Sequence, residues 1–266
     1  MKKDSLISTT EDIPAEQFAK LVLDTGEILI ASGAHCGRIH RNIKRFGDRW
    51  NFNVDLFISF TILSVTVTDK SNPKNTTTRN RQSVANGVHF GKLTEISLLT
   101  WKVFETNITI NETEDLLNQI KTASNHNKWS IRIGIGMACA SLCILAGGDY
   151  IDGGLTFIAS FIGLLVRQTI AGKRFNQMIA ILFAAFATTM ISGMDMYFQL
   201  GKSPETAVAT SVLYLIPGVP LINCVIDLFE GYIPTAIARG TFGGFVLICM
   251  AVGMLLSMTI IGINNF

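Results

Sequence analysis

Two kinds of hydrophobic pattern divide the chain near residue 128. Up to that point, apolar residues recur at helical or alternating spacing among frequent charges, whereas beyond it they form long uncharged runs. Five of these runs approach or exceed the roughly 20 residues that cross a bilayer. The sequence therefore predicts a multi-pass α-helical membrane domain at residues 129–266, preceded by a folded domain at residues 1–128. The predicted spans cover residues 131–146, 151–170, 175–193, 206–228 and 234–263.

Within residues 1–128 the spacing of apolar positions predicts a small α+β domain. Its first element is one long helix over residues 15–46, interrupted at residues 31–34 by small residues that allow close packing or a kink. Thr109 or Asn111 is expected to cap the last helix. Strands are expected over residues 52–59, 61–68 and 82–89, a polar loop over 69–81, and helices over 93–104 and 112–123.

Composition separates the same two regions. Only 16% of the 266 residues are charged, and residues 131–266 hold just six of the 22 basic and six of the 20 acidic residues. Soluble domains carry about a quarter charged residues, so the chain as a whole is too apolar to be one. A net charge of +2 without a basic cluster argues against nucleic acid as a partner.

The distribution of charge around the spans predicts how the chain is oriented. Basic residues cluster before the first span and at the second turn, and such turns face the cytoplasm by the positive-inside rule. No secretory signal precedes them, so we expect the N-terminal domain to be cytoplasmic. The inner-side residues are Lys128, Arg132, Arg167, Lys173 and Arg174, and the outer-side residues are Asp149, Asp152, Asp195 and Glu205.

A break is expected in the middle of the fourth span. Pro217, Gly218 and Pro220 lie within four residues, and each proline removes a backbone donor and disfavours the preceding helical turn. Unwound backbone at membrane depth is tolerated where it lines a cavity, and secondary transporters use such breaks to bind anions. The break is therefore either a substrate site for a carboxylate or a structural kink.

Polar residues follow this break. Asn223 and Asp227 share one helix face, and Arg239 lies inside the next apolar run. Ionisable groups within spans are costly and usually face a protein interior or an aqueous cavity. Asp227 could pair with Arg239, Arg239 could bind a substrate carboxylate, or both could extend to water at the membrane edge, which the nearby Glu230 indicates.

Two further groups of residues are open to more than one interpretation. Asp149 and Asp152 form either a solvated turn or, with Arg167, a proton or ion site or a gate. Cys36 and His40 are four residues apart on the first helix, as a nucleophile and its base would be, but no third group has recognisable spacing. We therefore expect no catalytic residue, metal site or cofactor, and all five cysteines as free thiols.

These motifs together resemble the threonine/serine exporter-like family. The N-terminal part of the resemblance is residues 31–38, which include Ser32, Gly33, His35 and Arg38. The membrane part consists of Gly147-Gly148-Asp149, Val166-Arg167-Gln168, Leu215-Ile216-Pro217-Gly218-Val219-Pro220-Leu221-Ile222-Asn223, Asp227, Gly231 and Ala238-Arg239. Residues 184–193 and the Pro-Gly-x-Pro run resemble most the larger, YjjP-type subunit of a two-component succinate exporter.

The resemblance implies an exporter of small carboxylates in the bacterial inner membrane, with succinate and other dicarboxylates ahead of threonine and serine. Many members have Glu and Thr where this chain has His35 and Cys36, which argues against a hydrolase-like role for that helix. Members with a second five-span half imply that a separate, YjjB-like small membrane subunit is the partner here. A homo-oligomer, or an accessory subunit with a regulatory or hydrolase-like soluble domain, are the alternatives.

Overall fold

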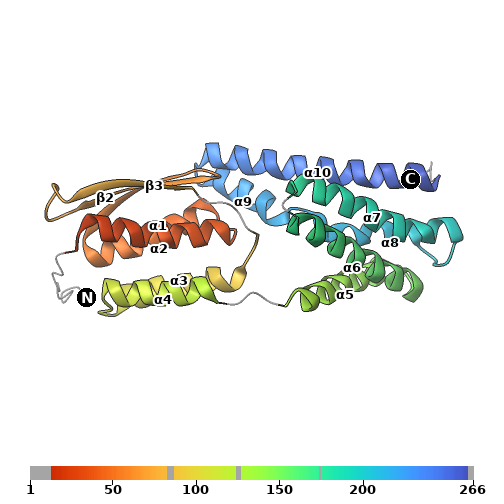
Figure 1. Cartoon of the computed structure of the whole chain (residues 1–266), viewed down its shortest axis with the longest axis horizontal. Coiled ribbons are helices and arrows are strands. Elements are labelled where there is room, and N and C mark those ends of the chain that lie inside the picture. The colour runs from red at the N-terminus through yellow and green to blue at the C-terminus, as the bar shows by residue number, and fades with distance from the viewer. Residues whose placement is uncertain (1–12, 83–86, 124–126, 174, 263–266) are drawn as a thin grey trace. The chain divides into compact units, whose positions relative to one another are not determined.

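The computed structural model describes residues 13–82, 87–123, 127–173 and 175–262, and they form two compact units (Figure 1). Unit 1 consists of residues 1–123 and 222–239, and unit 2 of residues 124–221 and 240–266. The chain is mostly helical with one three-stranded sheet, which confirms the predicted helical membrane protein with a small α+β region. The cytoplasmic position of that region and its boundary at residue 128 remain predictions.

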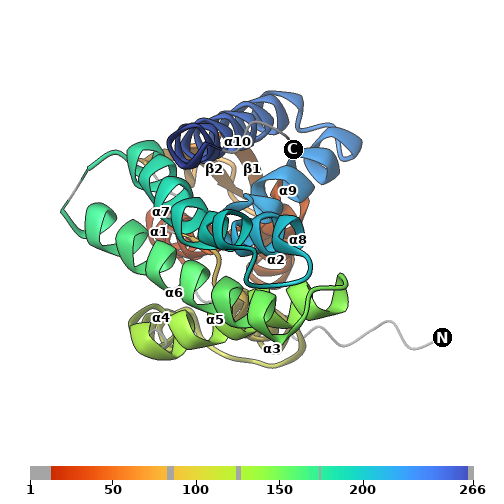
Figure 2. The ribbon, with the colours of Figure 1, turned by 90° about the vertical axis from the view of Figure 1, so that its right-hand side faces the viewer.

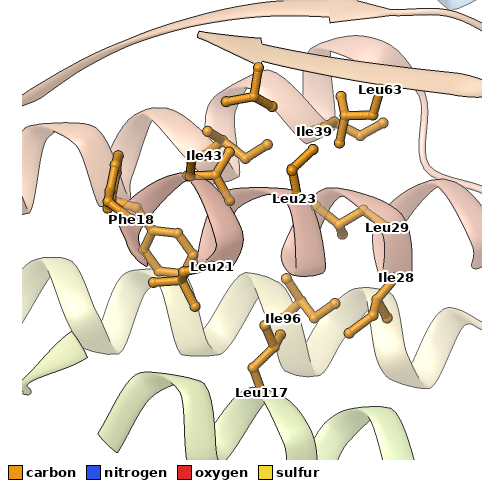
Figure 3. Close-up of a cluster of buried hydrophobic side chains, with 14 of the residues drawn as sticks. Phe18, Leu21, Leu23, Ile28, Leu29, Ile39, Ile43, Leu63, Ile96 and Leu117 are labelled. Atoms are coloured by element: carbon orange, nitrogen blue, oxygen red, sulfur yellow. The ribbon is translucent and has the colours of Figure 1, made fainter. Parts of the chain in front are cut away.

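Unit 1 is built in three layers around one hydrophobic core (Figures 1 and 3). The antiparallel sheet covers the first two helices, and the next two helices cover their other side. Phe18, Ile43 and Leu63 are fully buried between the first two layers, and Ile96 between the second and third. The elements are α1 (Ala15–Ala31), α2 (Cys36–Trp50), β1 (Phe52–Ile58), β2 (Ile62–Asp69), β3 (Thr76–Gln82), α3 (Phe90–Glu105) and α4 (Ile110–Thr122).

The expectation of one helix over residues 15–46 is wrong, because the chain turns at the small-residue patch. Gly33 has a φ of 87°, a conformation that favours glycine. Its N–H donates to the Ile30 carbonyl at 3.0 Å, and the Ala34 N–H donates to the Leu29 carbonyl at 3.0 Å. These two bonds form a Schellman motif that ends α1.

The third strand lies at residues 76–82, where the sequence predicted a polar loop. β3 is an edge strand of the sheet made of polar residues, most of them exposed, so it gives no apolar alternation. Cross-strand hydroxyl pairs, Thr66 with Thr78 and Thr68 with Thr76, each at 2.9 Å, join it to β2. Part of the predicted strand at 82–89 lies outside the described residues.

Of the two residues expected to cap α4, Thr109 is the one that does so. The Thr109 side chain accepts from the Glu112 N–H at 3.3 Å, and the Glu112 carboxylate accepts from the Thr109 N–H at 3.0 Å. This reciprocal pair is a capping box.

Unit 2 contains the long apolar helices, viewed near their ends in Figure 2. The helix α6 packs against both α5 and α7, and the short α8 packs against all three. A Cβ on Gly253 would meet the backbone of α7, so this glycine lets α10 approach α7 closely. The elements wholly in unit 2 are α5 (Lys128–Leu145), α6 (Tyr150–Gly172), α7 (Gln177–Phe198), α8 (Pro204–Ser211) and η1 (Leu213–Leu215). Two further helices, α9 (Gly218–Phe229) and α10 (Ile233–Ile261), are divided, since their residues 222–239 belong to unit 1.

Four of the described helices, α5, α6, α7 and α10, are long and apolar enough to cross a membrane. The α8–η1 segment and α9 qualify as a fifth span together, bent by 63° at the break between them. The predicted spans therefore correspond to helices, although Ile263, at the end of the last span, lies outside the described residues, as does Arg174 of the preceding inner-side residues. Asp195, expected at a turn, instead lies within the last turn of α7.

Candidate functional site

The end of α1 and the start of α2 expose backbone groups that a helix cannot pair internally. His35 is the N-cap of α2, and its Nδ1 lies 3.3 Å from the backbone nitrogen of Arg38. The carbonyls of Gly33 and Ala34 and the N–H of Cys36 are left for other partners. We call residues 32–36 the α1–α2 junction.

Three polar side chains from residues 222–239 bind this junction. Asn223 Nδ2 donates to the Gly33 carbonyl at 2.8 Å, and Arg239 Nη2 donates to the Ala34 carbonyl at 2.8 Å. Asp227 Oδ1 accepts from the Cys36 N–H at 2.7 Å. The three residues predicted to act together are thus brought together, through contacts with backbone some 190 positions earlier in the chain.

Asp227 and Arg239 also form an ion pair. Arg239 Nη1 lies 3.2 Å from Asp227 Oδ2, and the two side chains are 8% and 0% exposed respectively. The pairing alternative is therefore the arrangement that the structure has. Because burial of an unpaired charge costs several kcal/mol, each residue stabilises the other here.

Glu230 lies beside the same helix end, and Arg41 joins it. Its carboxylate contacts His35 Nδ1 at 3.1 Å and Arg41 Nη1 at 2.9 Å. A Cβ at Gly37 would overlap that carboxylate, so the glycine leaves room for it. Burial alone would raise the pKa of Glu230, but hydrogen bonds from Arg41 and His35 outweigh burial and hold the pKa below its ordinary value.

Donor atoms of His35, Asp227 and Glu230 lie within 4.8 Å of one another, which is a possible metal-binding geometry. Each carboxylate, however, already faces a guanidinium: Arg239 for Asp227 and Arg41 for Glu230. These charges balance the carboxylates without a cation, so we assign no metal to the group.

Cys36 is fully buried at this junction. Burial, and then the negative charge of Asp227, raise the pKa of its thiol to about 12. A thiol with so high a pKa stays protonated at neutral pH and is a poor nucleophile. His40, the proposed base, lies on the exposed side of α2.

The other members of the N-terminal motif connect elements of unit 1. Arg38 Nη2 donates to the Leu93 carbonyl at 3.3 Å and lies 3.2 Å from Ser97 Oγ, which ties α2 to α3. The buried Ser32 accepts from the His89 N–H through its carbonyl at 3.1 Å.

The Pro217–Pro220 run begins α9. The Gly218 N–H donates to the Ile216 carbonyl at 2.8 Å and the Leu221 N–H to the Pro217 carbonyl at 3.1 Å. Pro220 has no N–H to offer. The N–H groups of Gly218 and Leu221 are therefore already used within the protein.

The acidic turn before α6 is a capping box. The Asp149 side chain accepts from the Ile151 and Asp152 N–H groups, each at 2.9 Å, while Asp152 Oδ2 accepts from the Asp149 N–H at 2.7 Å. Asp152 is nonetheless completely buried, as is Asp195. The sequence did not indicate Asp195 as a buried residue, because an acid at the end of an apolar run resembles one in a turn.

Arg167 lies half-buried on α6, where its charge acts on the Tyr214 side chain. The Tyr214 hydroxyl lies 3.0 Å from Thr188 Oγ1. A Cβ on Gly163 would overlap both of these oxygens, so this glycine gives the pair room inside unit 2.

The fold and these polar contacts define the class: a multi-pass helical membrane protein with charged groups bound inside it. The chain belongs to the family described as "Putative threonine/serine exporter", which it matches over residues 20–261.

Its relatives in that family include two proteins named "Probable succinate transporter subunit YjjP". The one from Escherichia coli (strain K12) is 28% identical over 93% of this chain and 96% of its own. The one from Klebsiella aerogenes is 28% identical over 71% of this chain and 73% of its own. A "Probable threonine/serine exporter" from Mycobacterium tuberculosis is 20% identical over 96% of this chain but 48% of its own. No solved structure matches the chain.

Proposed function

We propose that the chain is the membrane subunit of a secondary exporter for small carboxylates, with succinate or another dicarboxylate as the substrate. The observation that carries this proposal is the nearly end-to-end match to a protein named as a succinate transporter subunit. Export of threonine or serine is the second candidate, and the relative named as a threonine/serine exporter favours it.

The partner in this proposal is a separate, YjjB-like small membrane protein. Two relatives are named as subunits, and the chain matches only 48% of the longer relative from Mycobacterium tuberculosis. A second chain would then supply what the other half of that relative contains. It would also shield the broken backbone at Pro217, which lipid does not tolerate.

The substrate site in this proposal lies along α9 and the start of α10. Pro217, Gly218 and Pro220 end one helical segment and begin another, and Asn223, Asp227 and Arg239 follow. A substrate carboxylate would compete with Asp227 for Arg239, because a guanidinium binds a carboxylate of a substrate as it binds one of the protein. A second carboxylate on the substrate would bind the start of α9, which favours a dicarboxylate.

A transport assay tests these assignments. The chain is reconstituted in liposomes alone and with its partner, and movement of labelled succinate, threonine and serine is measured in parallel. We expect succinate transport that requires both chains. Faster threonine or serine transport would favour the second substrate class, and full transport by this chain alone would contradict the two-component proposal. If no substrate moves even with the partner, the exporter assignment fails.

A further inference from the structure

Asp152 and Asp195 are two fully buried acids inside unit 2. Asp152 lies in the first turn of α6 and Asp195 in the last turn of α7. Their side chains are within hydrogen-bonding reach of each other. Gly201 contacts both, since its N–H donates to Asp195 and a Cβ there would overlap Asp152 Oδ1.

Backbone donors satisfy one oxygen of each carboxylate. Asp152 Oδ2 accepts from the N–H groups of Asp149 at 2.7 Å and Ser203 at 3.1 Å. Asp195 Oδ1 accepts from the Gly201 N–H at 2.8 Å. Within the described residues, Asp152 Oδ1 and Asp195 Oδ2 are buried without any hydrogen-bond partner.

The nearby charges do not neutralise these two acids. Asp149 adds a further negative charge to their surroundings, and Lys202 acts on Asp149 from an exposed position. Glu205, at the start of α8, is exposed, and Cys143, which packs beside Gly148, is a buried thiol. Two buried carboxylates in contact cannot both be ionised at a tolerable cost.

We propose that Asp152 and Asp195 share one exchangeable proton and that transport is coupled to protons at this pair. This inference rests on the proposed function, since it assigns the two residues that would carry the proton in that exporter. A proton on one carboxyl supplies the missing donor, because a neutral acid donates an O–H while an ionised one only accepts. Its release to water leaves two negative carboxylates that repel each other, so the start of α6 and the end of α7 separate.

Transport driven by a proton gradient tests the coupling. Asp195→Asn replaces the exchangeable proton by a fixed amide N–H. Asp152→Asn makes the same replacement at the other acid of the pair. Liposomes holding the chain and its partner are assayed for succinate accumulation under a pH gradient and for succinate exchange without one. We expect both variants to lose the pH-driven accumulation and keep the exchange, while the exposed control Glu205→Gln keeps both. Accumulation by both aspartate variants as in wild type, or accumulation driven by sodium instead of pH, would overturn the inference.

Infrared difference spectroscopy separates this inference from the exporter assignment, because it requires no transport. The purified wild-type protein is expected to show a protonated-carboxyl band at neutral pH that is absent from Asp152→Asn and from Asp195→Asn and unchanged in Glu205→Gln. A wild-type spectrum without that band overturns the shared proton, whatever the transport assay shows. If the band is present and no substrate moves in the wild-type assay, the proposed function fails and the protonated pair stands.

Discussion

Arg239 Nη1 lies 3.2 Å from Asp227 Oδ2 in a buried pair, and each partner also binds the α1–α2 junction. Arg239 donates to the Ala34 carbonyl and Asp227 accepts from the Cys36 N–H. Residues 222–239 are therefore part of the folded structure of unit 1, although the sequence places them between and within apolar runs.

Breaking this pair on one side should destabilise unit 1 more than removing both charges. Arg239→Gln leaves Asp227 buried and unpaired, which costs about 3–5 kcal/mol. In the double variant Asp227→Asn/Arg239→Gln no unpaired charge remains, so the loss should be smaller. Thermal unfolding in detergent measures both.

The control for that comparison is the more exposed pair of Lys20 and Glu114, whose atoms lie 3.5 Å apart. Lys20→Gln should change the free energy of unfolding by about 1 kcal/mol or less. If the double variant is as unstable as Arg239→Gln or more so, Asp227 and Arg239 do not stabilise each other.

Cys36 should not react with thiol reagents in the folded protein. Burial and the charge of Asp227 raise its pKa to about 12, so almost no thiolate exists at pH 8. Maleimide labelling followed by mass spectrometry should find Cys36 unmodified until the protein is denatured, with Lys74→Cys at an exposed position as the reactive control. Rapid labelling of Cys36, or loss of transport in Cys36→Ala, would revive a nucleophilic role.

Glu230 should make the stability of unit 1 depend on acid pH. Its pKa is lowered from 4.5 because hydrogen bonds from Arg41 and His35 outweigh burial. A lowered pKa adds stability above the ordinary value, and this contribution disappears as pH falls through the lowered one. Wild type should therefore unfold at a higher temperature than Glu230→Gln at pH 7, with a difference that shrinks as the pH falls below 4.5.

Unfolding temperatures measured from pH 7 to pH 3 check this relation. Glu95→Gln, which removes an exposed carboxylate of α3, is the matched control and should show no such pH-dependent difference. A difference between wild type and Glu230→Gln that stays the same from pH 7 to pH 3 would mean that Glu230 acts through packing and not through its charge.

Single cysteines should report the orientation of the chain in the membrane. The excess of basic residues around positions 128 and 173 predicts an inner side there. In a background without the five native cysteines, positions 149 and 202 should react with an impermeant reagent from outside, and positions 70 and 173 only after the membrane is opened. External labelling at position 70 would refute a cytoplasmic N-terminal domain.

The spacing of apolar residues predicted the helices and strands that bury one face. It did not predict elements that are polar or that depend on contacts with residues far away in the chain. The buried alternation of Val65 and Val67 identifies β2. The polar edge strand β3 has no such signal, because hydrogen bonds to β2 define it rather than a buried face.

The candidate site, too, was predicted only in part from the sequence. The residue types at positions 223, 227 and 239 indicated a polar group, and the structure brings the three side chains together at the α1–α2 junction. Their partners could not be predicted, since the junction at Gly33–Cys36 lies about 190 positions away in the chain. Asp195 was missed because its burial depends on a contact with Gly201 and Asp152, beyond the end of its own helix.

The break before α9 should matter for transport independently of stability. Ile216 is extended and Pro217 precedes the first residue of α9, so Pro217→Ala restores an N–H and allows helix to continue from η1. We expect succinate efflux per folded protein to fall about tenfold, the effect of ~1.4 kcal/mol on binding. Asn223→Ala and Arg239→Ala should also reduce efflux. Pro234→Ala is the matched control, because Pro234 lies in the first turn of α10, where a proline does not interrupt a helix. Parental rates in all three test variants, with unchanged protein levels in the membrane, would place the substrate site elsewhere and leave the Pro217–Pro220 run as a structural kink.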